Sequence, residues 1–202
     1  MALQQTVQQL GYAHVQLLDV LTDDLAALNT ATVIILNGGY EFLLLKNLRE
    51  THVLERLRTL ALAGKPIYGI SAGAILLGPD LDLYAYLYPE DNTEQLASTT
   101  AINATTIRIY PHYDVHCEVK PQLPQLITDW EHKTGVTVKR LTNNQGLLVH
   151  GSQIQIHKCD TAMLGFELTA WLNAGLRPPT VLMDFFKPWV STAIKQSVGL
   201  QD

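Results

Sequence analysis

The sequence predicts an α/β protein built on a mostly parallel, doubly wound sheet. Short apolar runs typical of buried strands, such as Ala31 to Leu36 and Ile67 to Ile70, alternate with segments of helical periodicity. Of the 202 residues, 47% are hydrophobic, which is enough to fill one sizeable core. Because alternating strands and helices are typical of parallel sheets covered by helices, we expect one α/β domain.

The first part of the chain alternates between the two kinds of element. Helices are expected over residues 3–10, 19–28, 41–62 and from 72 onward, and strands over 14–18, 31–36 and 67–70. Gly11 can end the first helix, and a break is expected near Thr51 in the longest one.

Residues 79–100 are polar and acidic and predict a surface loop. After this loop we expect a strand over 101–110, a helix over 121–133, a strand over 136–141 and a hairpin over 147–156. Residues 1–158 are therefore assigned to the α/β domain. Residues 159–202 are assigned to a helical extension, with helices over 161–174 and 185–196, that packs on the domain or on a second subunit.

Composition excludes several classes of function. The net charge is −5 without a basic patch, which argues against nucleic acid as a partner. Cys117 and Cys159 form no metal-like cluster and suggest free thiols in a reducing compartment. Neither a secretion signal nor an apolar stretch long enough for a bilayer is evident, so a cytoplasmic protein without membrane contact is expected. Nucleotide-binding glycine loops are also lacking, and no cofactor is expected.

Ser71 stands where a predicted strand passes directly into a predicted helix. A serine at such a sharp turn has the geometry of a nucleophile elbow, which lifts the hydroxyl above the sheet. Gly69 and Gly73 occupy the two positions where this turn needs small residues. The alternative is an ordinary tight turn in which the serine caps the helix.

Gly38 and Gly39 follow the preceding strand. If the two strands are neighbours, the Gly39 N–H can face the same space as the Ala72 N–H, because sites in such sheets lie at the carboxyl ends of the strands. Two such donors would form an oxyanion hole beside Ser71.

His112 comes just after the strand expected to end at Tyr110, so it can reach a serine at the end of a neighbouring strand. The alternative is a metal site or a surface cluster, since four suitable side chains would share helical spacing if a helix began here. They are His112, Asp114, His116 and Glu118.

Three separated stretches resemble the aspartyl dipeptidase (peptidase E) family of serine peptidases, which includes cyanophycinases. They are residues 34–45 (IILNGGYEFLLL), 69–74 (GISAGA) and 110–114 (YPHYD). The resemblance implies a class I glutamine-amidotransferase-like three-layer sandwich. It also implies Ser71 as nucleophile, His112 as general base, and hydrolysis of small peptides with N-terminal aspartate without a metal.

The residue that orients His112 is less evident. Asn143 stands where the resemblance would place an acidic residue, and an amide cannot stabilise an imidazolium by charge. The family's other acid lies between serine and histidine, which points to Glu90 or Asp91. We favour Asp91, with a solvated loop carboxylate as the alternative.

Other departures bear on activity. Tyr40 replaces the family's asparagine and would narrow the pocket, although it also belongs to the expected substrate-binding segment. The chain begins later than family members, which carry about two more strands, and the exposed strand edge favours a homodimer. Candidate basic groups for an acidic substrate are Arg108, Lys139 and Arg140. The expected function is a serine dipeptidase. The alternatives are a catalytically inactive binding or assembly protein and another amidohydrolase.

Overall fold

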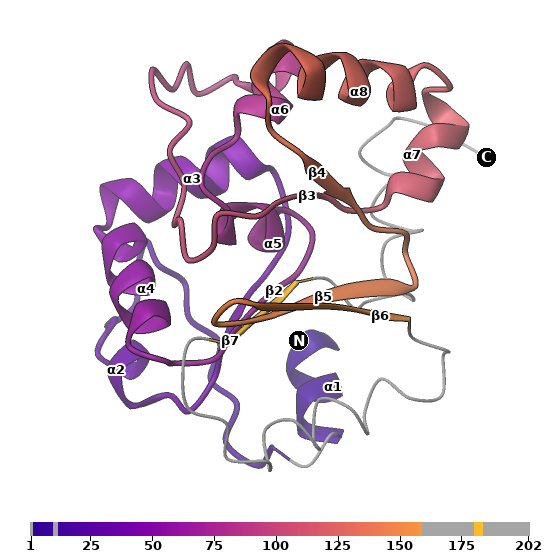
Figure 1. Cartoon of the computed structure of the whole chain (residues 1–202). Coiled ribbons are helices and arrows are strands. Elements are labelled where there is room, and N and C mark those ends of the chain that lie inside the picture. The colour runs from indigo at the N-terminus through magenta and orange to yellow at the C-terminus, as the bar shows by residue number, and fades with distance from the viewer. Residues whose placement is uncertain (1, 10–11, 159–179, 184–202) are drawn as a thin grey trace, which may run out of the picture.

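A five-stranded sheet with the order β1-β2-β7-β5-β6 forms the main framework (Figure 1). The computed structural model describes residues 2–9, 12–158 and 180–183. The strands are β1 (Ile34–Leu36), β2 (Ile67–Gly69), β5 (Gln145–His150), β6 (Gln153–Lys158) and β7 (Thr180–Met183). Strands β1, β2 and β7 are parallel, whereas β5 is antiparallel to both β7 and β6. The α/β class is thus confirmed.

A second, two-stranded parallel sheet consists of β3 (Arg108–Tyr110) and β4 (Val138–Arg140). The prediction of one continuous sheet was therefore wrong. Among the described strands, β3 and β4 pair only with each other, so the strand before His112 is not a hydrogen-bonded neighbour of β2. Figure 1 shows this pair on the α5 side of the main sheet, with α6 and α8 beyond it.

The expected helices agree best with the structure where the periodic apolar pattern extends over many residues. They are α1 (Ala2–Gln9), α2 (Ala27–Thr30), α3 (Glu41–Glu50), α4 (Val53–Leu62), α5 (Ala72–Leu77), α6 (Asp82–Leu87), α7 (Tyr113–Val119) and α8 (Leu123–Thr134). The break expected near Thr51 separates α3 from α4, where His52 adopts a left-handed conformation with φ 59°.

Several segments differ from expectation. Residues 14–18 form no strand, and the predicted loop over 79–100 contains α6 and a short 3-10 helix, η1 (Pro89–Asp91). The strand expected over 101–110 shrinks to β3. The reason is that the amides of Ala101 and Ile102 donate instead to the carbonyls of Pro79 and Leu76.

Of the segment 159–202, which the sequence analysis assigned to a helical extension, the structure describes residues 180–183. Its two helices, over 161–174 and 185–196, lie outside the described residues. The described part of this segment is β7, a strand that the sequence analysis did not predict. It lies between β2 and β5 and joins the parallel half of the sheet to the hairpin.

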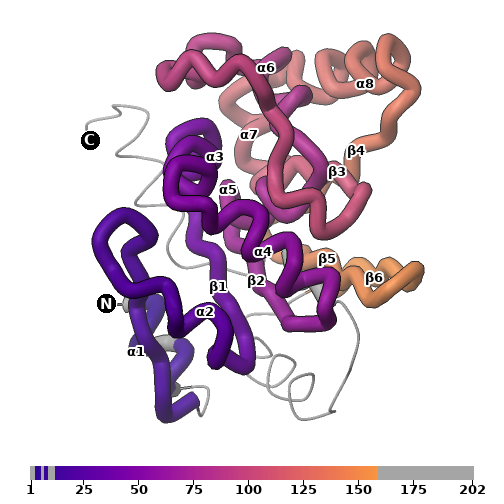
Figure 2. Tube along the Cα trace, turned by 90° about the vertical axis from the view of Figure 1, so that its left-hand side faces the viewer, coloured from indigo at the N-terminus to yellow at the C-terminus, as the bar shows by residue number. Residues whose placement is uncertain are grey.

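Helices lie on both faces of the main sheet. Helix α5 lies on one face, where α3 and α4 also contribute to the large apolar cluster around Leu45, Leu57 and Leu76 (Figure 2). Helix α1 lies on the other face, where Leu3 packs against a smaller cluster containing Tyr68. The β2–α5 connection is therefore held between two packed layers, which gives the residue at this turn a rigid support.

Candidate active site

Ser71 lies at the sharp turn between β2 and α5, with φ 51° and ψ −117°. A serine rarely adopts this conformation, and such strain is common at functional sites. The Ser71 side chain makes no capping hydrogen bond to α5, so the alternative of an ordinary helix cap does not describe it. A Cβ atom on Gly73 would lie 2.1 Å from the Leu36 carbonyl oxygen, which explains why this turn requires a glycine.

The glycines after β1 lie beside Ser71. Strands β1 and β2 pair in parallel with Leu36 opposite Gly69, so their carboxyl ends are adjacent. A Cβ atom on Gly38 would lie 3.0 Å from the Ser71 Cβ atom. Gly39 has φ 144°, a conformation that favours glycine, and directs the chain into α3. The two segments expected to supply oxyanion donors are thus brought together.

His112 connects Ser71 to Asn143. Its Nε2 atom lies 3.1 Å from the Ser71 Oγ atom, and its Nδ1 atom lies 2.6 Å from the Asn143 Oδ1 atom. Because an amide oxygen only accepts hydrogen bonds, Nδ1 carries the proton and Nε2 can accept the Ser71 hydroxyl. His112 is only 5% exposed, so its ring is largely shielded from bulk water.

The backbone holds His112 in place from both sides. His112 itself adopts a left-handed conformation with φ 55° and precedes α7. The Tyr113 amide donates to the Leu141 carbonyl, and the Leu141 amide donates to the Tyr110 carbonyl, both at 2.9 Å. These bonds continue the β3–β4 pairing past the ends of the strands. They bring His112 to the turn that carries Asn143, in place of the expected pairing with β2.

Asn143, not Asp91, is the residue at the Nδ1 side of His112. Asp91 lies in η1, and both hydrogen-bonding nitrogens of His112 are engaged by Ser71 and Asn143. Burial raises the pKa of the Asp91 carboxyl, Glu90 adds to the rise and Lys120 opposes it. The choice of Asp91 as orienting residue was therefore wrong, because Asn143 occupies the Nδ1 side of His112.

Sequence reasoning missed a chain of hydrogen bonds next to His112. The Tyr88 and Tyr110 hydroxyls lie 2.6 Å apart, and the Tyr110 hydroxyl lies 2.9 Å from His116 Nδ1. The His116 ring centroid is 5.9 Å from that of His112. Burial lowers the pKa of His116 to about 4, the nearby His112 adds to this shift, and Asp114 opposes it. A neutral His116 adds no positive charge beside the candidate base.

The metal alternative finds no support in the described geometry. A helix, α7, does begin after His112, but His112 and His116 direct ring nitrogens at Ser71, Asn143 and Tyr110. Within residues 2–9, 12–158 and 180–183, no three His, Cys, Asp or Glu side chains are placed to share a metal ion.

Two further expectations concern thiols and membranes. Cys117 is a free thiol on α7, whereas Cys159 lies outside the described residues. None of the described helices has the length and apolarity that crossing a bilayer requires.

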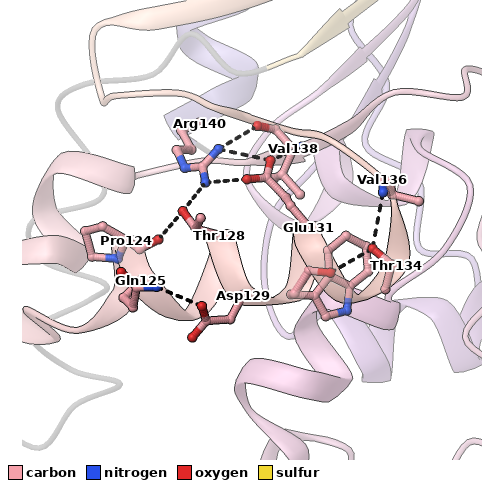
Figure 3. Close-up of polar contacts among 10 residues, drawn as sticks. Pro124, Gln125, Thr128, Asp129, Glu131, Thr134, Val136, Val138 and Arg140 are labelled. Carbon is pink, nitrogen blue, oxygen red and sulfur yellow. Dashed lines mark hydrogen bonds and ion pairs between the residues drawn. The ribbon is translucent and has the colours of Figure 1, made fainter.

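The arginines considered for binding an acidic substrate are both engaged. Arg108 forms an ion pair with Asp80, and Arg140 Nη2 lies 2.7 Å from Glu131 Oε2 (Figure 3). Glu131 holds the pKa of Arg140 above its ordinary range, mainly by the hydrogen bond between them. Lys139 is exposed on β4. Either arginine would have to leave a carboxylate partner before it could bind a substrate.

The Tyr40 side chain is largely exposed. Tyr40 is the residue directly before α3, and 67% of its surface is exposed. Tyr40 therefore lies at the surface next to the Gly38–Gly39 turn, and a narrowing of the pocket by Tyr40 stays a prediction. Any role in substrate binding would be that of a rim contact.

Comparisons with known proteins identify the family of this chain. The model of Peptidase family S51 matches residues 1–157. The uncharacterized peptidase PM1590 of Pasteurella multocida (strain Pm70) is 30% identical over 142 residues, which are 68% of this chain and 67% of that protein. The uncharacterized peptidase Lmo0363 of Listeria monocytogenes (strain EGD-e) is 26% identical over 147 residues, 69% of each chain.

The fold is also found in a solved structure. A crystal structure of a Listeria monocytogenes EGD-e protein assigned as a peptidase E superposes with a TM-score of 0.59 at 22% identity, covering 72% of this chain and 71% of that one. Because the family model covers more than half of the sequence, the chain belongs to peptidase family S51.

Proposed function

We propose that the protein is a serine-type peptidase that hydrolyses small peptides, with Ser71 as nucleophile and His112 as general base. The observation that carries this proposal is the 3.1 Å separation of His112 Nε2 from Ser71 Oγ, at a strained turn between a strand and a helix. This is the distance over which a base can accept the proton of a nucleophile. Membership of a peptidase family supports the same reaction class.

The proposed reaction begins when Ser71 Oγ attacks the scissile carbonyl carbon and His112 Nε2 takes the hydroxyl proton. The backbone N–H groups of Gly39 and Ala72 would stabilise the oxyanion of the tetrahedral intermediate. The intermediate collapses as His112 returns the proton to the leaving amine. Water, deprotonated by His112, then hydrolyses the acyl-serine ester and restores the enzyme. Throughout, Asn143 would keep the Nδ1 proton of His112 directed away from Ser71.

The proposed substrates are dipeptides with an N-terminal aspartate, a class that rests on the resemblance of residues 34–45, 69–74 and 110–114 to aspartyl dipeptidases. The ion pairs of Arg108 and Arg140 argue that another group would have to bind the aspartate side chain. A panel of dipeptides that differ only in the first residue tests this point, because an acidic preference predicts the highest kcat/KM for aspartate.

A fluorophosphonate probe tests the nucleophile directly. We expect labelling of the unaltered protein, loss of labelling in Ser71→Ala, and strong reduction in His112→Ala. Ser152→Ala is the matched control, because Ser152 is an exposed serine in the turn between β5 and β6. If Ser71→Ala were labelled as fast as the unaltered protein, the assignment of Ser71 as nucleophile would be contradicted.

The second candidate is a catalytically inactive binding or assembly protein, and the neutral Asn143 is the observation that favours it. Asparagine in place of the aspartate partner of a catalytic histidine can lower kcat by about 10⁴ where the histidine then adopts the wrong tautomer. No labelling of correctly folded protein, together with no hydrolysis of peptides or of glutamine-type amides, would favour this function. Amide hydrolysis without peptide hydrolysis would instead favour another amidohydrolase.

The finer architecture is also a proposal. Helices on both faces of the main sheet support a three-layer sandwich of the class I glutamine-amidotransferase type. The separate β3–β4 pair is its main departure from such a sandwich. A crystal structure with β3 hydrogen-bonded to the main sheet would restore the simpler arrangement.

A further inference from the structure

Asp114 makes a contact that the proposed reaction has not used. It lies in the first turn of α7, two residues after His112, and its side chain is directed back toward the turn between β4 and β5. There its Oδ1 atom accepts a hydrogen bond of 3.0 Å from the backbone N–H of Asn143. The same Asn143 holds the Nδ1 proton of His112 with its side-chain oxygen. Asp114 is thus connected to His112, the candidate base, through a single intervening residue, Asn143.

The position of the Asn143 turn depends on few contacts. The backbone bonds between the two segments end with the Tyr113 amide and the Leu141 carbonyl. Further along the turn, Gln145 bonds with Thr142 through its Oε1 atom and its amide. Those bonds shape the turn internally but do not tie it to α7. Among the described hydrogen bonds, the one from Asn143 to Asp114 is the tie between the turn and α7 beyond Leu141.

We propose that Asp114 is a positioning residue that acts on His112 through Asn143, an inference that rests on the proposed peptidase function. By holding the Asn143 backbone, Asp114 keeps the amide oxygen at hydrogen-bonding distance from Nδ1. The ring then retains its Nδ1 proton and presents the Nε2 lone pair to Ser71. A small displacement of a group that orients a catalytic histidine lowers the rate, because fewer molecules have the reactive geometry.

The hydrogen bond from the Asn143 N–H to Asp114 acts by holding the geometry of the turn. Substitutions can distinguish this effect from an effect of the negative charge of Asp114. Asparagine at position 114 retains a side-chain oxygen that can accept the Asn143 N–H, although it lacks the negative charge. Alanine removes both, and it is well tolerated in a helix at an exposed position. Glu118→Ala is the matched control, because Glu118 is an exposed carboxylate on the same helix, four residues further along.

Steady-state kinetics on a cleaved dipeptide test the proposal. We expect Asp114→Ala to lower kcat about fivefold with KM nearly unchanged, which is the effect of losing one hydrogen bond of roughly 1 kcal/mol. Asp114→Asn and Glu118→Ala should stay within about twofold of the unaltered protein. In an Asn143→Ala background, Asp114→Ala should have no further effect, because the residue through which it acts is already gone. An additive loss, or equal losses in Asp114→Ala and Asp114→Asn, would overturn the proposal.

The histidine tautomer gives a readout that needs no activity. Two-dimensional ¹H–¹⁵N NMR of the imidazole side chains should show His112 protonated on Nδ1 in the unaltered protein and in Asp114→Asn. Asp114→Ala should show a mixture of tautomers. If peptides and probes fail to react while these spectra behave as expected, the peptidase proposal fails and the positioning role stands. An unchanged His112 spectrum in Asp114→Ala rejects the positioning role whatever the activity.

Discussion

The Oδ1 atom of Asn143 lies 2.6 Å from the Nδ1 atom of His112, so a neutral amide occupies the position next to the candidate base. The amide fixes the ring orientation and the tautomer, as an acid would. It differs in the charge that it offers to the imidazolium formed when Ser71 loses its proton.

Asn143→Asp should raise kcat/KM by about 10-fold, because a carboxylate keeps the hydrogen bond to Nδ1 and stabilises the imidazolium by charge. Asn143→Ala should lower it by about 10-fold or more, because the ring then loses its orienting partner. Hydrolysis of one dipeptide at several pH values measures both. A slower Asn143→Asp enzyme would show that this site does not favour an imidazolium.

Gly73→Ala should lower the free energy of unfolding by about 3 kcal/mol or more, because the added methyl group has to displace backbone. Its Cβ would meet the Leu36 carbonyl oxygen at 2.1 Å and the Asn37 carbonyl oxygen at 2.7 Å. Urea unfolding gives the comparison. The control is Gly151→Ala, which adds its methyl group in open space at φ 57° and should cost only about 1 kcal/mol.

The free energy of unfolding should decrease as the pH is lowered from 6.5 to about 4, because of the titration of His116. Burial lowers its pKa to about 4 from the ordinary 6.5, so in this interval the unfolded chain binds a proton that the folded protein does not. The stabilisation is complete above pH 6.5 and decreases as the pH falls through the interval. At pH 4.5 the loss should be about 2 kcal/mol by this linkage.

His116→Gln tests this linkage, because glutamine does not titrate and can still bond with Tyr110. Its free energy of unfolding should change less between pH 7 and pH 4.5 than that of the unaltered protein. His132→Gln, which removes an exposed histidine from α8, should leave the pH dependence as it was. Identical pH profiles for all three proteins would contradict the assignment to His116.

Glu131→Ala should lower the free energy of unfolding by about 1 to 2 kcal/mol, since it removes the acceptor of two groups on β4. The Glu131 Oε1 atom accepts from the Val138 amide at 2.7 Å, and Arg140 bonds to both carboxylate oxygens (Figure 3). Asp129→Ala on the same helix removes only the contact with Gln125 and should cost less than about 0.5 kcal/mol. Thermal or urea unfolding distinguishes the two variants, and equal losses would argue against a special role of Glu131.

Local chemistry explains what the sequence could predict. The turn at Ser71 and the hairpin turn at Gly151 were foreseen because small residues and strand patterns specify them over a few positions. The break at Thr51 between α3 and α4 was foreseen from periodicity for the same reason. The approach of His112 to Ser71 followed from placing both at strand ends, although His112 follows a strand of the second sheet.

Pairing between distant segments explains the rest. An apolar strand pattern does not state its partner, so neither the separate β3–β4 pair nor the insertion of β7 between β2 and β5 could be read from residues alone. Asp91 was chosen by counting along the chain, whereas Asn143 reaches His112 through the bonds of Leu141 with Tyr110 and Tyr113. These contacts depend on the assembled fold.

The backbone angles of Ser71 have a consequence for how this site would change under mutation and drift. A residue with φ 51° and ψ −117° is tolerated best as glycine, so Ser71→Gly should gain roughly 1 kcal/mol in stability. In a related protein that did not need the hydroxyl, replacement of this serine by glycine would therefore be favoured by stability. The serine at this position therefore carries a cost in stability, and the unfolding free energy of Ser71→Gly measures that cost.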